Sequence, residues 1–161
     1  MKRVSVLLLL CLAIFYNCEK DDFCTKNPVT PMLVLRLYDA TNRDTIKSAK
    51  FLSIWAEGKD TISGYQSVTK DSIAIPLNSL TSETVYHFKI NTLEGNLANN
   101  QIETFTIQYA PVHEFVSRSC GYRVLFNEVT FSSNNTWIQE FTPSTLTTID
   151  NQNAAHVKIY H

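Results

Sequence analysis

Cysteines are the residues of this chain with the most distinctive chemistry, and Cys18 has the clearest context. It follows a short basic start at residues 2–3 and an uncharged, almost wholly apolar run over residues 4–16, and it precedes the charged segment 19–22. This order is typical of a bacterial lipoprotein signal, which is cut before a cysteine that carries lipid into a membrane. The apolar run is too short to cross a bilayer as a helix, which takes ~20 residues. We therefore predict a signal peptide over residues 1–17 and a lipid-modified, palmitate-bearing Cys18.

Cys11 is the rival site of lipid attachment. It would leave an apolar region of only residues 4–10, and the residues that follow it are still apolar. Charged residues follow Cys18, so Cys18 fits the signal better. One feature departs from the usual pattern, because the bulky residues Phe15 and Tyr16 stand shortly before Cys18, where small residues are normal.

Cys24 and Cys120 remain as a pair once Cys18 carries lipid. Disulfides persist in the oxidising compartments to which a secretory signal leads. The wide spacing of the two cysteines lacks the character of a zinc site. We predict a Cys24–Cys120 disulfide, and the alternative is two free buried thiols.

No catalytic motif accompanies these cysteines. The chain has no GxSxG, HExxH, phosphate-loop or dinucleotide pattern, and it contains only 4 glycines. The histidines lack metal-ligand spacing and are interpreted as ordinary surface residues: His87, His113, His156 and His161. We predict no metal and no cofactor.

The segment Phe115–Tyr122 is the densest local cluster of functional side chains. Its Ser117, Arg118 and Ser119 could together bind an anion. The favoured interpretation is a strand entry pinned by the disulfide at Cys120, with a glycine turn beside it.

Three Asp-Ser/Thr-apolar triplets resemble the O-glycosylation sequon of proteins exported by Bacteroidota. They make Thr45, Thr61 and Ser72 candidate sites of O-glycosylation. The alternative interpretation is that each acid belongs to a turn and the next residue begins a strand.

Composition restricts the class of partner. Removing residues 1–17 from the 161 leaves 144, a length suited to a single domain. The 14 basic residues fall to 12 against 15 acidic ones, so the formal net charge becomes −3. No run of Lys or Arg remains, and we therefore predict no nucleic-acid partner.

Apolar residues recur with the spacing of β-strands, and no useful helical stripe is visible. Seven strands are predicted at Met32–Tyr38, Lys50–Ala56, Ser72–Leu77, Val85–Ile90, Thr104–Tyr109, Tyr122–Phe131 and Val157–Tyr160. We expect an all-β domain over residues 32–161, an antiparallel two-sheet sandwich of immunoglobulin-like outline, after a lipidated tether at 18–31. A barrel is the alternative. Pro76 indicates a short or edge strand. The expected core comprises Leu33, Leu35, Leu37, Phe51, Trp55, Phe88, Ile90, Phe105, Ile107, Val124 and Phe126.

Three segments resemble a family of small Bacteroidota lipoproteins of unknown function: CEKDDFC at 18–24, TPMLVLRLYD at 30–39 and FVSRSCGYRVLF at 115–126. The resemblance implies a lipoprotein and pairs the cysteines at 24 and 120, but it carries no activity. It implies an outer-membrane location. The acidic cluster after Cys18 is similar to the surface-export signal of these bacteria, which favours display on the outer face.

Two classes of function follow from these features. The first is a noncatalytic binding or assembly module at the cell envelope, anchored to the membrane by lipid and contacting a protein or glycan partner through exposed loops, with Trp137 as either a contact or a packed residue. The second is an envelope glycan hydrolase, which needs two carboxyl groups about 5–9.5 Å apart in a cleft. Its candidate carboxylates are Asp39, Glu83, Glu103 and Glu128.

Overall fold

The computed structural model describes residues 24, 29–91 and 96–161. Residues 1–17 and Cys18 lie outside this part of the chain, so the signal peptide and the lipid site stay predictions. The described residues form strands and one 3-10 turn, η1 (Leu97–Asn99), and none of their helices could cross a membrane. The strands are β1 (Leu33–Tyr38), β2 (Ala49–Ala56), β3 (Val68–Lys70), β4 (Ser72–Ile75), β5 (Glu83–Asn91), β6 (Asn100–Ser117), β7 (Gly121–Ser133), β8 (Glu140–Thr142), β9 (Thr145–Ile149) and β10 (Val157–Tyr160).

The chain divides into two compact units. The larger comprises residues 29–114 and 123–161, and the smaller contains Phe115–Tyr122 together with the segment that bears Cys24. The larger unit holds both sheets and the core, and the smaller holds the turn that joins β6 to β7.

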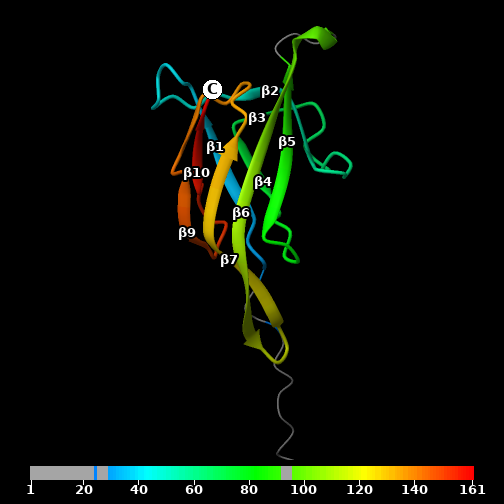
Figure 1. The fold of residues 1–161 in the computed structure, drawn as a ribbon, viewed down its shortest axis with the longest axis vertical. Helices are drawn as coiled ribbons and strands as arrows, with labels where there is room; N and C mark the ends of the chain where they lie inside the picture. Colours follow the sequence, from blue (N-terminus) through cyan, green and yellow to red (C-terminus); the bar gives the residue numbers. More distant parts are fainter. Residues whose placement is uncertain (1–23, 25–28, 92–95) are drawn as a thin grey trace, which may run out of the picture. The chain divides into compact units, whose positions relative to one another are not determined.

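Two sheets make up the sandwich, which confirms the predicted fold class (Figure 1). One sheet has the order β4-β1-β10-β8, and the other has the order β3-β2-β5-β6-β7-β9. The pairs are antiparallel with one exception among those described: β1 and β10 run parallel, with Leu35 opposite Val157. This pairing places strands from the two ends of the domain side by side.

All seven predicted strands are present, and three further strands were not predicted. These are β3, β8 and β9, each of three to five residues. All three lie at an edge of a sheet, where a strand pairs on one side only and carries a weaker apolar pattern. The fourth edge strand is β4, which ends just before Pro76, as the proline predicted.

The core lies between the two sheets and draws on inward-facing side chains of both. Nine of the expected core residues are buried, but Phe51 and Trp55 are only partly so. Phe51 has a φ of 51°, and the pairing of β2 with β3 shifts register between Ala49 and Leu52. The bulge reverses the alternation beyond it, so Leu52 and Ile54 enter the core and Trp55 faces outward.

Candidate functional site

An open hollow of ≈ 590 Å³ lies where β5 begins. Its walls come from the end of β2 and the turn after it, from the β4–β5 loop, and from the first residues of β5. The lining mixes charged side chains, among them Glu57, Lys59 and Glu83, with the apolar Leu77 and Leu80. Leu80 lies in the β4–β5 loop, and 89% of its surface is exposed to solvent. A hollow of this composition can contact both polar and apolar parts of a partner.

The back of this hollow is fixed by a closed ring of hydrogen bonds. The Asn78 N–H donates to the Thr84 hydroxyl over 3.0 Å, and the Tyr109 hydroxyl donates to the Asn78 carbonyl over 2.8 Å. Thr84 and Tyr109 also hydrogen-bond each other, and because the Tyr109 proton is already committed, the Thr84 hydroxyl is the donor. The ring ties the β4–β5 loop to β5 and β6, so this wall is set before any partner binds.

Tyr86 provides a second tie between the same elements. Its hydroxyl donates to the Pro76 carbonyl, and its ring is buried against the core. Burial, with the nearby Tyr109 contributing, raises the pKa of Tyr86 to about 12. The hydroxyl is therefore neutral at physiological pH and acts as a fixed donor rather than as an acid.

Two of the four candidate carboxylates meet at a neighbouring hollow of ≈ 380 Å³. Glu83 and Glu128 both line it, together with residues that include Gln108 and Thr130. The Gln108 side-chain amide donates to Glu83 over 3.1 Å. Asp39 is not in this hollow. It lies directly after β1 and forms an ion pair with Lys47, whose Nζ is 3.2 Å from the carboxylate. Backbone N–H donation from Asn42 is the main cause that lowers the pKa of Asp39.

Glu103 is a buried structural anchor rather than a group open to a substrate. It is 0% exposed, and one carboxylate oxygen accepts the backbone N–H groups of Thr136, Trp137 and Ile138 over 2.8, 3.0 and 3.1 Å. The other oxygen accepts the Ser133 hydroxyl. With four donors, this carboxylate holds the segment between β7 and β8 against β6.

Trp137 packs within that segment, which is the second of the two roles that the sequence left open for it. It is 6% exposed, and its indole N–H donates to the Phe88 carbonyl over 2.9 Å. The side chain is therefore part of the core and is not available as a contact for a partner.

An aromatic and ionisable cluster that the sequence did not predict lies on the outer face of the six-stranded sheet. Trp55 and His87 are opposite each other on β2 and β5, and their rings stack with centroids 5.3 Å apart. His87 Nε2 bonds the Glu57 carboxylate, and Nδ1 lies 3.3 Å from the Thr104 hydroxyl. Glu57 also lines the hollow at the start of β5, so the cluster adjoins it. The sequence did indicate that His87 points outward, because it alternates with the inward-facing Phe88. It did not indicate that Trp55 lies beside His87, because that depends on the bulge at Phe51.

Two other histidines are bound into the fold instead of lying free on the surface as predicted. The Val34 N–H donates to His156 Nδ1 over 2.9 Å, and His156 Nε2 donates to the Asn151 carbonyl. His161 bonds the Lys47 carbonyl. Burial is the first cause that lowers the pKa of both His156 and His161. Both are therefore structural histidines held in their neutral form near pH 7.

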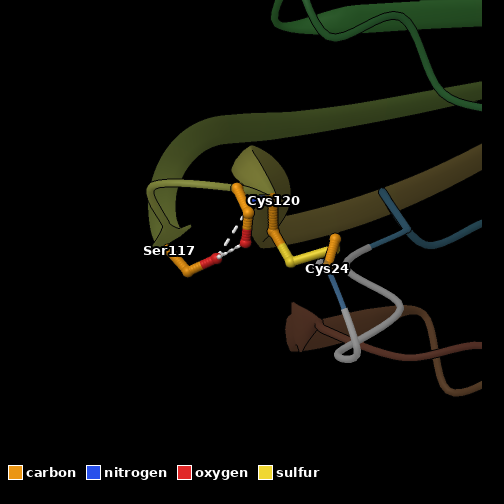
Figure 2. Close-up of a disulfide and its surroundings, with 4 residues drawn as sticks. Cys24, Ser117 and Cys120 are labelled. Atoms are coloured by element: carbon orange, nitrogen blue, oxygen red, sulfur yellow. Dashed lines mark hydrogen bonds between the residues drawn. A yellow bond between two sulfur atoms is a disulfide. The ribbon is translucent and has the colours of Figure 1, made fainter. Parts of the chain in front are cut away.

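The predicted disulfide is present in the smaller unit. Cys24 and Cys120 are bonded across a sequence separation of 96, with their Cα atoms 4.9 Å apart (Figure 2). The Ser117 hydroxyl accepts the Cys120 N–H over 3.0 Å and lies 3.2 Å from the Ser119 hydroxyl. These hydroxyl groups organise the turn, which supports the pinned strand entry over an anion site.

The three candidate glycosylation residues occupy different parts of the larger unit. Thr45 and Thr61 are exposed in the loops after β1 and β2, and Ser72 is half-buried at the start of β4, opposite Arg36. Their modification stays a prediction. Within residues 24, 29–91 and 96–161, no group of three or more His, Cys, Asp or Glu residues is placed to hold a metal ion.

Comparison with known proteins identifies a family for most of the chain. Residues 51–161 match the model of a protein family described as a family of unknown function, DUF6452. Searches of the curated proteins and of the solved structures found no significant match. The match begins within β2 and includes the hollow, Glu103 and Cys120.

Proposed function

We propose a binding role for this chain, which belongs to the DUF6452 family of unknown function. In this proposal it is a lipoprotein, anchored in the outer membrane through Cys18, that binds a protein or glycan partner without transforming it. The observation that carries the proposal is the hollow at the start of β5. Its back wall is fixed by internal hydrogen bonds while its rim leaves Leu80, Glu57 and Lys59 for a partner.

The contrast between wall and rim supports binding because a fixed wall lowers the entropy lost on association. Thr84 and Tyr109 satisfy each other and the Asn78 backbone, so they need no rearrangement when a partner arrives. Exposed Leu80 offers apolar surface at the rim, and the neighbouring charges can orient a polar partner.

The rim can be tested against a matched site at the other end of β5. Leu80 precedes β5 and Leu97 follows it, and both are strongly exposed, at 89% and 79%. We expect Leu80→Asp to weaken the binding of a ligand found in a panel of envelope glycans and peptides by about tenfold, the effect of ~1.4 kcal/mol. Leu97→Asp should leave the affinity unchanged.

Titration calorimetry measures the affinity, and mass spectrometry of the recovered ligand reports whether it has been altered. If Leu80→Asp and Leu97→Asp weakened binding equally, the hollow beside Leu80 would not be the binding site. An altered ligand would contradict the noncatalytic role.

The anchor is supported by the basic, apolar, cysteine, acidic order of the first 22 residues and by the resemblance to lipoproteins. Two or more acyl chains on Cys18 would hold the protein stably on a membrane. We expect Cys18→Ala to abolish processing and lipid attachment, as measured by mass spectrometry of the membrane fraction. Normal processing of this variant would contradict the anchor.

A glycan hydrolase is the second candidate, and the observation that favours it is that Glu83 and Glu128 line one hollow. Paired carboxylates of this kind act as acid and base or as nucleophile in glycoside hydrolysis. If the chain cleaves a glycan in the panel, Glu83→Gln and Glu128→Gln should each abolish turnover. Retained turnover in both variants would exclude these residues.

A further inference from the structure

Two aromatic side chains are exposed at the turn of the smaller unit. Phe115 is 56% exposed and Tyr122 is 67% exposed, and their rings meet edge to face with centroids 5.3 Å apart. They flank the turn between β6 and β7, so one lies on each strand of the hairpin. An exposed aromatic pair leaves a large apolar area in contact with water, which favours an apolar or interfacial environment.

The charge of this turn is of one sign. Within the segment from Phe115 to Tyr122 the one ionisable side chain besides tyrosine is that of Arg118, which is exposed at the tip. The Ser117 and Ser119 hydroxyls face each other beside it. Aromatic rings next to an arginine are the combination found where a protein meets lipid headgroups.

The disulfide limits how far this turn can lie from the lipid anchor. Cys24 is the sixth residue after Cys18, and a fully extended chain of that length spans at most about 22 Å. The Cα atoms of Cys24 and Cys120 are 4.9 Å apart. A lipid on Cys18 therefore keeps Cys120 within roughly 27 Å of the lipid-bearing residue, whatever path the intervening residues take.

From these observations we infer that the Phe115–Tyr122 turn is a second membrane contact, in which Phe115 and Tyr122 enter the headgroup region and Arg118 meets lipid phosphates. The inference rests on the proposed anchor at Cys18. The disulfide then has a positional role, because it couples the anchored segment to the hairpin that touches the bilayer. A single lipid tether would leave the orientation of this hairpin turn undefined, whereas two attachment points restrict it.

Tryptophan quenching tests this contact in the full-length lipidated protein. Phe115→Trp and Tyr122→Trp are each reconstituted into vesicles of phosphatidylethanolamine and phosphatidylglycerol that contain a brominated phosphatidylcholine. Leu80→Trp, at an exposed loop of the larger unit, is the matched control, and the unsubstituted protein gives the background from Trp55 and Trp137. We expect the fluorescence of the introduced tryptophan to fall by about twofold at both turn positions, because bromine quenches rings at interfacial depth, and not at Leu80.

Vesicle flotation separates the two proposals. If the protein floats but neither turn variant is quenched more than Leu80→Trp, the membrane contact is wrong and the anchor stands. If the protein does not float, the anchor is wrong, and the inference about the turn fails with it. Quenching at both turn positions together with flotation supports both.

Discussion

Glu103 and Glu83 lie on neighbouring strands and share one chemistry, yet their surroundings differ completely. Glu103 on β6 is fully buried and accepts four hydrogen bonds that hold the β7–β8 segment. Glu83 at the start of β5 is exposed, lines two hollows and accepts one hydrogen bond from Gln108. A carboxylate in a strand is therefore structural where the fold supplies its hydrogen-bond donors, and it is free for a partner where the fold does not. No buried side-chain polar atom in the described residues lacks a hydrogen bond, so open sites in this part lie at the surface.

Among the predictions, the largest expected effect on stability is the difference between removing the Glu103 carboxylate and removing the Glu83 carboxylate. We expect Glu103→Ala to lower the free energy of unfolding by about 4 kcal/mol or more, because three backbone N–H groups lose a charged acceptor. Glu83→Ala should change it by less than about 0.5 kcal/mol, as is usual at the surface. Urea unfolding of both variants measures the contrast. Equal losses would mean that Glu103 is no more structural than Glu83.

The burial of Glu103 could have been predicted from the alternation of inward and outward side chains along its strand. Phe105 and Ile107 were predicted to lie in the core, and Glu103 is two residues before Phe105, so its side chain points to the same face of the strand. Extending the alternation by one step identifies Glu103 as buried, and a buried carboxylate is not placed to act as a general acid in an open cleft. Its donors were beyond prediction, because they come from backbone groups more than 30 residues away.

The fold class, seven of the strands and the disulfide were predictable because each depends on a local pattern or on pairing by elimination. The bulge at Phe51 was not, because nothing in the apolar spacing marks the positive φ that reverses the phase of β2. That one residue removed Trp55 from the predicted core and placed it beside His87. The hollows depend on how loops from β2, β4 and β5 meet, which no single segment encodes.

The disulfide between Cys24 and Cys120 is a covalent link, in contrast to the hydrogen bonds of Glu103. We expect Cys120→Ser to lower the free energy of unfolding by about 2–4 kcal/mol, since the bridge closes a long loop and restricts the unfolded chain. Thermal unfolding of the oxidised protein and the variant gives the measurement. Thiol labelling of the unreduced, denatured protein should find no reactive Cys24 or Cys120, and labelling of both would contradict the bridge.

A smaller effect is expected from the buried histidines as the pH falls. Burial lowers the pKa of His156 in the folded state below its ordinary value of 6.5, so below that pH the unfolded chain binds a proton that the folded chain does not. The contribution of neutral His156 to the free energy of unfolding is therefore complete above about pH 6.5. It is lost as the pH falls through the pKa that His156 has in the folded state. His161 acts in the same direction.

His156→Asn isolates this contribution. The asparagine carbonyl can still accept the Val34 N–H but cannot titrate. We expect urea unfolding of the variant to depend less on pH between about 5 and 7.5 than that of the unsubstituted protein. An unchanged slope would show that His156 does not couple protonation to folding.

The smallest effect on stability is expected at the rim of the hollow. Leu80 is mostly in water, so Leu80→Asp should alter the free energy of unfolding by less than about 0.5 kcal/mol. The same variant is expected to weaken partner binding. Loss of stability in Leu80→Asp would show that the rim supports the fold and would undercut its role as a free surface. Urea unfolding measured beside the binding titration distinguishes the two.

The parallel pairing of β1 with β10 joins strands from opposite ends of the described domain, and this affects the order in which the domain can fold. Val34 and His156 meet across 122 positions of sequence, so the four-stranded sheet cannot be completed until the last strand is available. Contacts of such separation slow folding, because a long loop must close before they form. The family match begins at residue 51 and leaves β1 outside. A fragment cut at that limit would remove the one neighbour of β4 and expose one side of β10, so the matched stretch is shorter than the four-stranded sheet requires.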